Sequence, residues 1–231
     1  MIISLTGFMG CGKSSVGREL SQLLCCRFMD LDEVVEEVAG KSISEIFTED
    51  GEGVFRNIEL ESLKNILCDS GRGKEIPMTP VCASRIHPLA GGGMSSTSHL
   101  PTASAIHTID NPDIPAVLAL GGGTVMTEEC AELIKANTCC IYLRASVDTI
   151  VERLSRDGDS RPLLNTSFTH SRSNVDVYKQ GADRHGNPLQ DRIAELLEQR
   201  AATYEKTANI VIDTDGKSID DISFEIFELL R

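Results

Sequence analysis

A glycine-rich turn directly after the first apolar segment constrains this chain more than any other feature. Residues 7–14 read GFMGCGKS, with glycines at Gly7, Gly10 and Gly12 and a lysine directly after them. This pattern is GxxxxGK[ST]. The apolar run MIISLT, typical of a buried strand, precedes it, and a segment with one apolar helical face follows it. A strand, a glycine loop and a helix in this order predict a phosphate-binding loop, in which backbone N–H groups and the helix N-terminus converge on a phosphate.

The side chains of this loop predict a nucleoside triphosphate as the ligand. Lys13 is placed to reach the β- and γ-phosphates, and the hydroxyl of Ser14 is placed to ligate Mg²⁺. A chance glycine turn is the alternative, which the strand–loop–helix setting disfavours. The nucleotide-binding residues expected here are Gly10, Cys11, Gly12, Lys13, Ser14 and Ser15.

Strand-like and helix-like segments alternate along the rest of the chain. Short apolar runs typical of strands occupy residues 26–32, 115–120, 139–146 and 209–214, and segments with helical patterning stand between them. Such alternation predicts an α/β fold with a mainly parallel sheet that helices cover on both faces. We expect a single domain over residues 1–231, because that length suits one core with insertions.

Two irregular stretches interrupt this alternation. Residues 69–115 and 157–189 are rich in Gly, Ser, Thr and Pro and show no sustained period. Segments of this length in a compact domain are insertions or functional lids, and we expect the first to be an insertion and the second an extended lid. All five histidines lie in them, so the general base of the regular fold is expected to be a carboxylate; they are His87, His99, His107, His170 and His185.

A pair of acids follows the second apolar run. Asp30 and Asp32 stand two residues apart in FMDLDE, at the end of the expected strand over residues 26–32. If strand geometry persists, both side chains point to the same side, where one carboxylate could hold the water shell of a metal ion and the other could accept a proton from an attacking hydroxyl. The alternative is a group of acids placed at a helix N-terminus, where the helix dipole favours them.

Three consecutive glycines end the strand expected over residues 115–120. Gly121, Gly122 and Gly123 leave only backbone to face a ligand, and that permits the close approach of a small, hydroxyl-rich molecule. A tight turn before the next helix is the alternative. A second glycine triplet, at residues 91–93, follows no strand and is interpreted as a loop.

Charge and composition exclude several classes of protein. The net charge of −13 argues against nucleic acid as a partner, since binding to a phosphate backbone needs clustered Lys and Arg. No apolar run approaches the ~20 residues of a membrane span, and the start lacks the basic region of a signal peptide. The eight cysteines contain no CxxC pair, and the adjacent ones at residues 25–26 and 139–140 suit buried strand thiols, so we expect a cytoplasmic protein.

Taken together, these motifs resemble the shikimate kinase family. The resemblance rests on GFMGCGKSS, the DLD acids, FRNIE at residues 55–59, LALGGGTV, RPLL at residues 161–164 and EQRAATY near the end, in the order of the family. It implies a fold similar to nucleoside monophosphate kinases: a three-layer α/β/α arrangement with a five-stranded parallel sheet and a mobile lid. It also implies transfer of the γ-phosphate of ATP to the 3-hydroxyl of shikimate, with Mg²⁺, in aromatic amino-acid synthesis.

The resemblance also implies roles for individual residues. Asp32 would contact the acceptor hydroxyl and act as base, and Asp30 would lie near the hydrated magnesium. Lys13 and Arg161, the latter from the lid, would act on the phosphates, and Arg153 would stack on adenine. The substrate-binding residues implied are Asp32, Arg56, Glu59, Gly121, Gly122, Gly123 and Arg200, where the two arginines clamp the carboxylate of shikimate and Glu59 orients Arg56.

Two other functions compete with this one. A related small-molecule kinase, such as a gluconate kinase, is disfavoured by Arg56 together with the glycines at residues 121–123. A module that senses ATP without turnover is disfavoured by Asp32 and Arg161, since a sensor needs neither a base nor a lid arginine. The partners expected are shikimate and ATP, with no membrane and no protein partner, and the chain is expected to be a monomer. The insertion and the long lid depart from the family pattern.

Overall fold

The computed structural model describes residues 1–69, 116–156 and 188–231. The predicted insertion over residues 69–115 and the predicted lid over residues 157–189 lie almost entirely outside the described residues. Arg161 and the five histidines therefore lie outside them too.

Five strands form one parallel sheet in the described part of the chain. They are β1 (Ile2–Thr6), β2 (Arg27–Asp30), β3 (Ala116–Ala119), β4 (Thr138–Arg144) and β5 (Ile210–Asp213), and their order in the sheet is β2-β3-β1-β4-β5. Every strand pairs in parallel with its neighbours. The parallel sheet predicted from the alternation of segments is confirmed, and so is the five-stranded form that the resemblance implied.

The helices follow the strands in the order that the sequence predicted. Their bounds are α1 (Lys13–Leu23), α2 (Leu31–Ala39), α3 (Ile43–Glu49), α4 (Glu52–Asp69), α5 (Glu128–Asn137), α6 (Val147–Arg156), α8 (Pro188–Thr207) and α9 (Ile219–Leu229), with a short 3₁₀ helix, η1 (Thr124–Met126), before α5.

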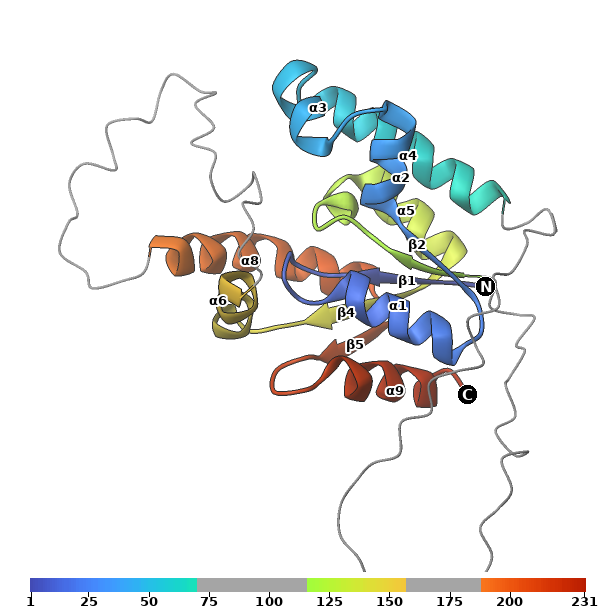
Figure 1. Ribbon diagram of the computed structural model, residues 1–231, viewed down its shortest axis with the longest axis vertical. Helices are drawn as coiled ribbons and strands as arrows, with labels where there is room; N and C mark the ends of the chain where they lie inside the picture. The colour runs from blue at the N-terminus through green and yellow to red at the C-terminus, as the bar shows by residue number, and fades with distance from the viewer. Residues whose placement is uncertain (70–115, 157–187) are drawn as a thin grey trace, which may run out of the picture.

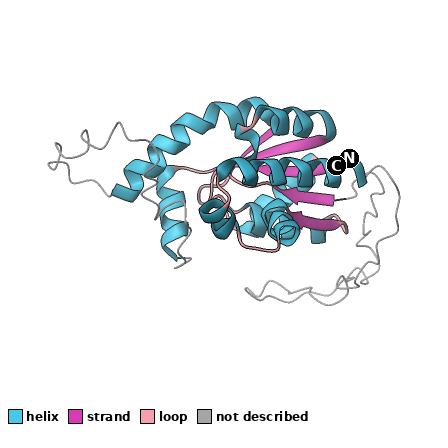
Figure 2. Ribbon diagram, turned by 90° about the horizontal axis from the view of Figure 1, so that it is seen from above, coloured by secondary structure: helices cyan, strands magenta, loops and turns pink. Residues whose placement is uncertain are grey.

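Helices cover both faces of the sheet (Figures 1 and 2). The chain passes from β1 through α1 toward the β2 edge, and from β3 through α5 toward β4, in the opposite direction. Right-handed crossovers then put α1 and α5 on opposite faces. Helix α9 packs on α1, whereas α8 contacts α5, α6 and β4, so the third layer is built from α5 and α8.

The core lies where these layers meet the central strands. All residues of β1 and β3 are buried, because a sheet covered on both faces has no solvent side. Local signals end the helices as their residues predict. Gly40 adopts a left-handed conformation, with φ of 67°, directly after α2, and Ser42 and Glu45 form a capping box at the start of α3.

One expected strand ends earlier than predicted. The segment 26–32 was expected to be a strand that carried both Asp30 and Asp32, but β2 stops at Asp30 and α2 begins at Leu31. The side chain of Asp30 accepts a hydrogen bond from the backbone N–H of Asp32 at 3.1 Å. An aspartate that caps the next turn in this way starts a helix rather than extending a strand.

The cysteines differ in part from their expected places. Cys139 and Cys140 lie in β4, as expected, although only Cys140 is buried. Cys25 and Cys26 are also only partly buried, and they precede β2. Cys25 has a positive φ of 49° in the turn that ends α1, which a strand does not allow. Within the described ranges the cysteines form no disulfide, and no helix there is long and apolar enough to cross a membrane.

Candidate active site

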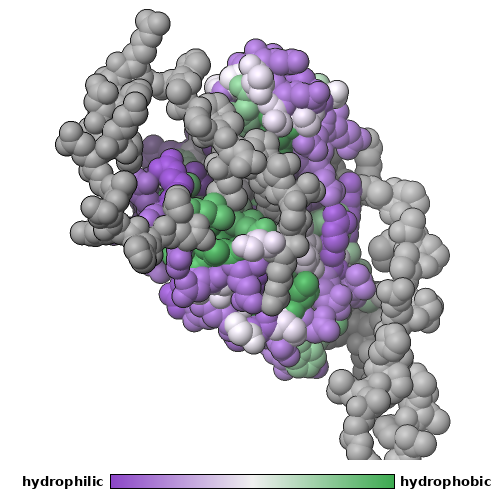
Figure 3. All heavy atoms as spheres, turned by 60° about the vertical axis from the view of Figure 1, so that its left-hand side comes forward, coloured by the Kyte–Doolittle hydropathy of each residue, from purple (hydrophilic) through white to green (hydrophobic). Residues whose placement is uncertain are grey.

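The loops predicted to carry function meet at one edge of the sheet. In parallel strands all carboxyl ends lie on the same side, so the glycine loop after β1, the acids after β2 and the glycines after β3 are brought together. Helices α6 and α8 extend past this edge on the left of Figure 1. Figure 3 views the molecule from that side, where apolar residues gather in the middle of a largely hydrophilic face.

The phosphate-binding loop has the backbone that its glycines predicted. Gly7, Gly10 and Gly12 have φ of 144°, 77° and 99°, values that residues with a Cβ rarely adopt. The loop thereby turns its peptide groups without side-chain cover, and Lys13 opens α1 immediately after it. Lys13 Nζ donates to the carbonyl oxygens of Gly7 at 3.0 Å and Phe8 at 3.1 Å, which holds its charge over the loop.

A hydroxyl and a carboxylate lie together beside this loop. Ser14 Oγ donates to Asp30 Oδ2 at 2.6 Å, which joins the start of α1 to the end of β2. Two hard oxygen donors next to a phosphate-binding loop suit Mg²⁺, which prefers a few protein oxygens, waters and phosphate oxygens as ligands. Within the described ranges no cluster of three or more His, Cys, Asp or Glu side chains could hold a metal ion. Ser14 and Asp30 are the side chains that could hold such an ion beside the loop.

Asp32 is a carboxylate with an altered proton affinity. It lies in the first turn of α2, and burial, followed by the nearby charge of Asp30, raises its pKa to about 6, while Lys13 acts in the opposite direction. A carboxylate with such a pKa is a better proton acceptor than an ordinary surface aspartate. Asp32 also lies at a helix N-terminus, where the helix dipole favours an acid. The two interpretations of this acid, a proton acceptor and a residue favoured by the helix dipole, are therefore compatible.

The glycine triplet lies directly against Asp32. A Cβ on Gly121 would be 2.7 Å from Asp32 Oδ1 and 2.9 Å from Thr124 Oγ1. A Cβ on Gly123 would be 2.8 Å from Arg56 Nη2. The glycines are therefore needed because the side chains of Asp32, Thr124 and Arg56 pack on the backbone there, in addition to forming the turn that leads into η1.

Arg56 is held by a buried acid. Its Nη1 donates to Glu59 Oε2 at 2.8 Å, and the Glu59 side chain is only 1% exposed. The other oxygen of Glu59 accepts from Thr124 Oγ1 at 2.6 Å. Burial opposes the charge of Arg56, but Glu59 and Glu52 outweigh it and raise the pKa of Arg56 above its ordinary value. A permanently charged, oriented guanidinium with 27% of its side chain exposed is suited to grip an anion.

Arg200 approaches the same region from α8. Its guanidinium lies over the ring of Phe8 in the phosphate-binding loop, with 5.8 Å from Cζ to the ring centre. The Tyr204 hydroxyl lies one turn further along α8, close enough for Arg200 to oppose the rise that burial causes in the pKa of Tyr204. Tyr204 in turn donates to the carbonyl oxygen of Gly122 at 2.5 Å. Arg56 therefore packs on the glycine triplet at Gly123, and Tyr204, the helical neighbour of Arg200, contacts the triplet at Gly122.

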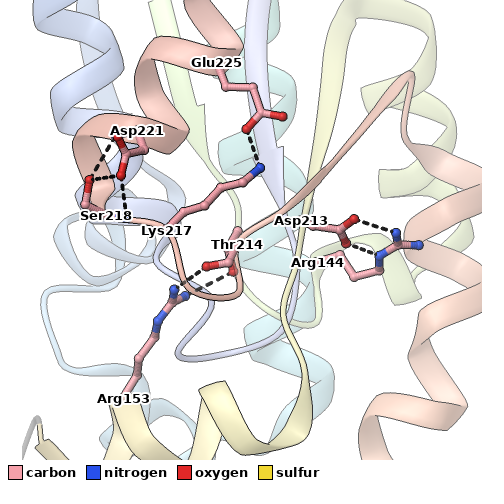
Figure 4. A network of polar contacts seen from close by, with 8 residues as sticks. All are labelled: Arg144, Arg153, Asp213, Thr214, Lys217, Ser218, Asp221 and Glu225. Atoms are coloured by element: carbon pink, nitrogen blue, oxygen red, sulfur yellow. Dashed lines mark hydrogen bonds and ion pairs between the residues drawn. The ribbon is translucent and has the colours of Figure 1, made fainter.

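Arg153 joins two loops at the carboxyl edge. It extends from α6 toward the loop after β5, where Nη2 donates to the carbonyl oxygen of Thr214 at 2.9 Å (Figure 4). Its Nη1 donates to Thr214 Oγ1 at 3.2 Å and to the carbonyl oxygen of Cys11 at 3.0 Å. The guanidinium thus lies beside the phosphate-binding loop and joins it to the loop after β5.

Three residues with clear roles in this arrangement were not singled out from the sequence. They are Thr124, Tyr204 and Thr214. Thr124 directly follows the glycine triplet, and Tyr204 lies one helical turn from Arg200, so proximity to motif residues was the available signal. Their partners lie far away in sequence: 65 residues separate Thr124 from Glu59, and 82 separate Tyr204 from Gly122.

Comparison with known proteins identifies one group. A family model described as shikimate kinase matches residues 9–72 and 103–231. The shikimate kinase of Dictyoglomus turgidum is 31% identical over 231 residues, which cover 99% of this chain and 96% of the relative. That of Chlorobaculum tepidum is 34% identical over 218 residues, covering 94% of this chain and 84% of the relative.

Solved structures share the fold. A shikimate kinase from Acinetobacter baumannii in complex with shikimate superposes with a TM-score of 0.67 at 24% identity, and covers 99% of this chain and 92% of its own. A shikimate kinase from Aquifex aeolicus superposes with a TM-score of 0.61 at 25% identity, with 100% of this chain and 96% of its own covered.

Proposed function

This chain belongs to the shikimate kinase family, and from that membership and the geometry of its site we propose how its residues transfer the γ-phosphate of ATP to the 3-hydroxyl of shikimate. The family supplies the reaction, which serves aromatic amino-acid synthesis and uses ATP as co-substrate. The observation that carries the assignment of roles is the convergence of the phosphate-binding loop, Asp32 and the Arg56–Glu59 pair on the glycine triplet at residues 121–123.

Asp32 is the proposed base. The oxygen of the acceptor hydroxyl attacks the γ-phosphorus, the bond from that phosphorus to the β,γ-bridging oxygen breaks, and ADP leaves. The hydroxyl proton passes to Asp32, which lies on the backbone of Gly121 and so borders the place where a ring would lie. Lys13 and the backbone of residues 7–12 hold the phosphates, so this chain supplies mainly alignment and positive charge.

Mg²⁺ is the proposed cofactor. Ser14 would ligate the ion directly, and Asp30 would hold it through water, because the two oxygens already lie 2.6 Å apart beside the loop. When bound, the ion supplies positive charge that neutralises the phosphates. Asp30 also caps α2 by accepting the backbone N–H of Asp32. It therefore fixes how far Asp32 lies from the proposed ligand Ser14.

Arg56 and Arg200 form the proposed carboxylate clamp. The Arg56 guanidinium packs on Gly123 and is oriented by Glu59, and the Arg200 guanidinium lies over Phe8 of the phosphate-binding loop. A planar guanidinium matches a carboxylate in two parallel hydrogen bonds, which selects shikimate over an acceptor without that group. Arg161, outside the described residues, is proposed to reach the phosphates, and Arg153 to stack on adenine. We further propose that the chain acts as a monomer.

An assay of ADP release tests this function against its two rivals. We expect release with shikimate and little with gluconate or without acceptor. Equal or faster release with gluconate would indicate a different sugar-acid kinase. ATP binding without release under any of these conditions would indicate a sensor.

Replacing Arg56 with alanine is expected to weaken the use of shikimate selectively. The variant removes one of the two arginines proposed to bind the shikimate carboxylate, and loss of one partner of a buried charge pair costs roughly 2–5 kcal/mol. A cost of about 2 kcal/mol corresponds to a fall of roughly 30-fold in kcat/KM for shikimate. The KM for ATP is expected to change little, because Arg56 contacts Glu59 and Gly123 rather than the phosphate-binding loop. Steady-state kinetics with each substrate varied in turn measures both effects.

A shikimate analogue without the carboxylate provides the control for Arg56. It is expected to be a poor acceptor for the natural enzyme and to lose little more in Arg56→Ala. Because Glu59 is buried, the variant also leaves a carboxylate without its ion pair, and thermal melting reports that damage. An equal loss with both acceptors would mean that Arg56 supports the fold rather than the substrate.

Replacing Gly121 with alanine is expected to displace the base. The added Cβ would come within 2.7 Å of Asp32 Oδ1 and 2.9 Å of the buried Thr124 hydroxyl, so Asp32 must move. A displacement of about 1 Å in a reacting group can cost roughly 100-fold, and we expect kcat to fall by about 10- to 100-fold. Gly53→Ala is the matched control, since a Cβ there meets nothing within 4 Å, and it is expected to leave kcat unchanged. Equal kcat values in the two variants would mean that Asp32 does not act in the reaction.

A further inference from the structure

Tyr204 is a buried tyrosine whose hydroxyl reaches the glycine triplet. It is fully buried in α8, and its ring stacks on Tyr142 of β4 with 5.1 Å between ring centres. From this fixed ring the hydroxyl donates to the carbonyl oxygen of Gly122 at 2.5 Å. The hydroxyl stays protonated, because burial, opposed by the nearby Arg200, raises the pKa of Tyr204. It is therefore a permanent donor to the backbone of the triplet.

Arg200 lies on the same face of α8 as this hydroxyl, since residues four apart on a helix are neighbours. Its charge acts on the hydroxyl and opposes the rise that burial causes in the pKa of Tyr204. Arg200 also rests over Phe8, so its charged end is restrained on two sides. The hydroxyl donates to Gly122 and lies one turn from Arg200, so one oxygen atom joins α8 to the loop after β3.

The other arm of the clamp rests on the next residue of that loop. A Cβ on Gly123 would lie 2.8 Å from Arg56 Nη2, so the Arg56 guanidinium packs directly on this backbone. Tyr204 and Arg56 therefore rest on adjacent residues of one loop, Gly122 and Gly123. Arg200 lies one helical turn before Tyr204 in α8, so this loop links the two arms of the clamp.

We propose that Tyr204 is a positioning residue that sets the spacing between Arg56 and Arg200 and thereby tunes recognition of the acceptor carboxylate. The inference rests on the carboxylate clamp proposed above. Two guanidiniums grip one carboxylate well only when their separation is held within about 0.5 Å. Long arginine side chains lose rotamer freedom when they bind, and a partner that orders one of them beforehand reduces that cost.

A purely structural role is the competing explanation, and the Tyr204→Phe variant separates the two. Phenylalanine keeps the ring and its stacking on Tyr142 but removes the hydroxyl. If Tyr204 positions the clamp, the KM for shikimate is expected to rise about tenfold, a change that corresponds to ~1.4 kcal/mol, with kcat changed less than about twofold and the KM for ATP unaltered. If Tyr204 only satisfies the core, the melting temperature falls and the KM for shikimate stays as it was, which overturns the proposal.

Tyr142→Phe is the matched control. It removes a hydroxyl from the other ring of the same buried pair, on β4 instead of α8. We expect it to lower the melting temperature by a similar amount while the KM for shikimate stays within about twofold of the natural enzyme. A tenfold rise in the KM in both variants would mean that loosening of this ring pair causes the effect, and the proposal would be wrong.

A double-mutant cycle with Arg200 tests whether Tyr204 acts through the clamp. In an Arg200→Ala background the change Tyr204→Phe is expected to raise the KM for shikimate by less than about threefold, because coupled residues are non-additive. Full additivity would overturn the proposal.

These variants also distinguish an error in the proposed clamp from an error in the role of Tyr204. If Arg200→Ala alone leaves the KM for shikimate unchanged, the clamp is wrong and the positioning role falls with it. If Arg200→Ala raises the KM but Tyr204→Phe does not, the clamp stands and only the role of Tyr204 is rejected.

Discussion

Replacing Lys13 with methionine is expected to abolish turnover while the fold survives. The methionine keeps most of the alkyl stem, but it removes the charge that lies over the phosphate-binding loop, where Nζ donates to the carbonyl oxygens of Gly7 and Phe8. Loss of one preorganised donor to developing charge costs about 10²–10³ in kcat, and Lys13 contributes a full positive charge as well. We therefore expect a loss of kcat of at least about 1,000-fold.

The measurement is ADP release at saturating ATP and shikimate, with circular dichroism and thermal melting of the same preparation. Lys64→Met is a matched control, since Lys64 is a surface lysine of α4 paired with Glu61. It is expected to leave kcat unchanged. Near-normal turnover by a folded Lys13→Met protein would show that the phosphates bind elsewhere.

Replacing Asp32 with asparagine is expected to stop phosphate transfer without preventing acceptor binding. Removal of a general base costs about 10²–10⁴ in rate, and the effect falls on kcat, because the base acts only as the hydroxyl attacks. Calorimetric binding of shikimate is expected to change by less than about threefold, since the clamp arginines are untouched. A large loss of binding with kcat retained would assign Asp32 to substrate binding only.

The melting temperature of Asp32→Asn carries independent information. Burial and the charge of Asp30 raise the pKa of Asp32 to about 6, so in the folded protein the ionised carboxylate is less favourable than in the unfolded chain. Above pH 6 the ionised group therefore lowers stability, and its removal is expected to leave the melting temperature equal or higher. A stability cost of this kind is common for catalytic groups.

Asp220→Asn is the control for the helix-dipole role of Asp32. Each aspartate is the second residue of its helix, Asp32 in α2 and Asp220 in α9, so both lose the same interaction with a helix N-terminus. Asp220 is exposed and far from the glycine triplet in sequence. The Asp220→Asn variant is expected to keep full kcat, and an equal loss in both variants would attribute the Asp32 effect to destabilised helices.

Short-range patterns predicted much of the fold. The strand, glycine loop and helix of residues 2–23 were predicted because positive φ at Gly10 and Gly12 and the apolar spacing of α1 are properties of neighbouring residues. The capping box of Ser42 and Glu45 is equally local. The alternation of segments implied a parallel sheet, because parallel strands need crossovers that helices supply.

Local rules competed at the end of β2, and there the prediction was wrong. A continued strand would have pointed Asp30 and Asp32 to the same side. Instead the Asp30 side chain accepts the N–H of Asp32 and begins α2. Apolar periodicity over so short a segment does not distinguish these two outcomes, whereas one capping hydrogen bond decides between them.

The sequence by itself determined that this chain forms a parallel α/β fold with a phosphate-binding loop, because each motif is encoded within a few consecutive residues. Only the tertiary structure decided the strand order β2-β3-β1-β4-β5, and with it which loops face one another. Thr124 meets the buried Glu59, and Tyr204 meets Gly122, through folding that joins residues 65 and 82 positions apart. Such contacts depend on how whole layers pack, since packing brings distant partners together and places their hydrogen bonds in the interior, where these bonds are electrostatically stronger than in water.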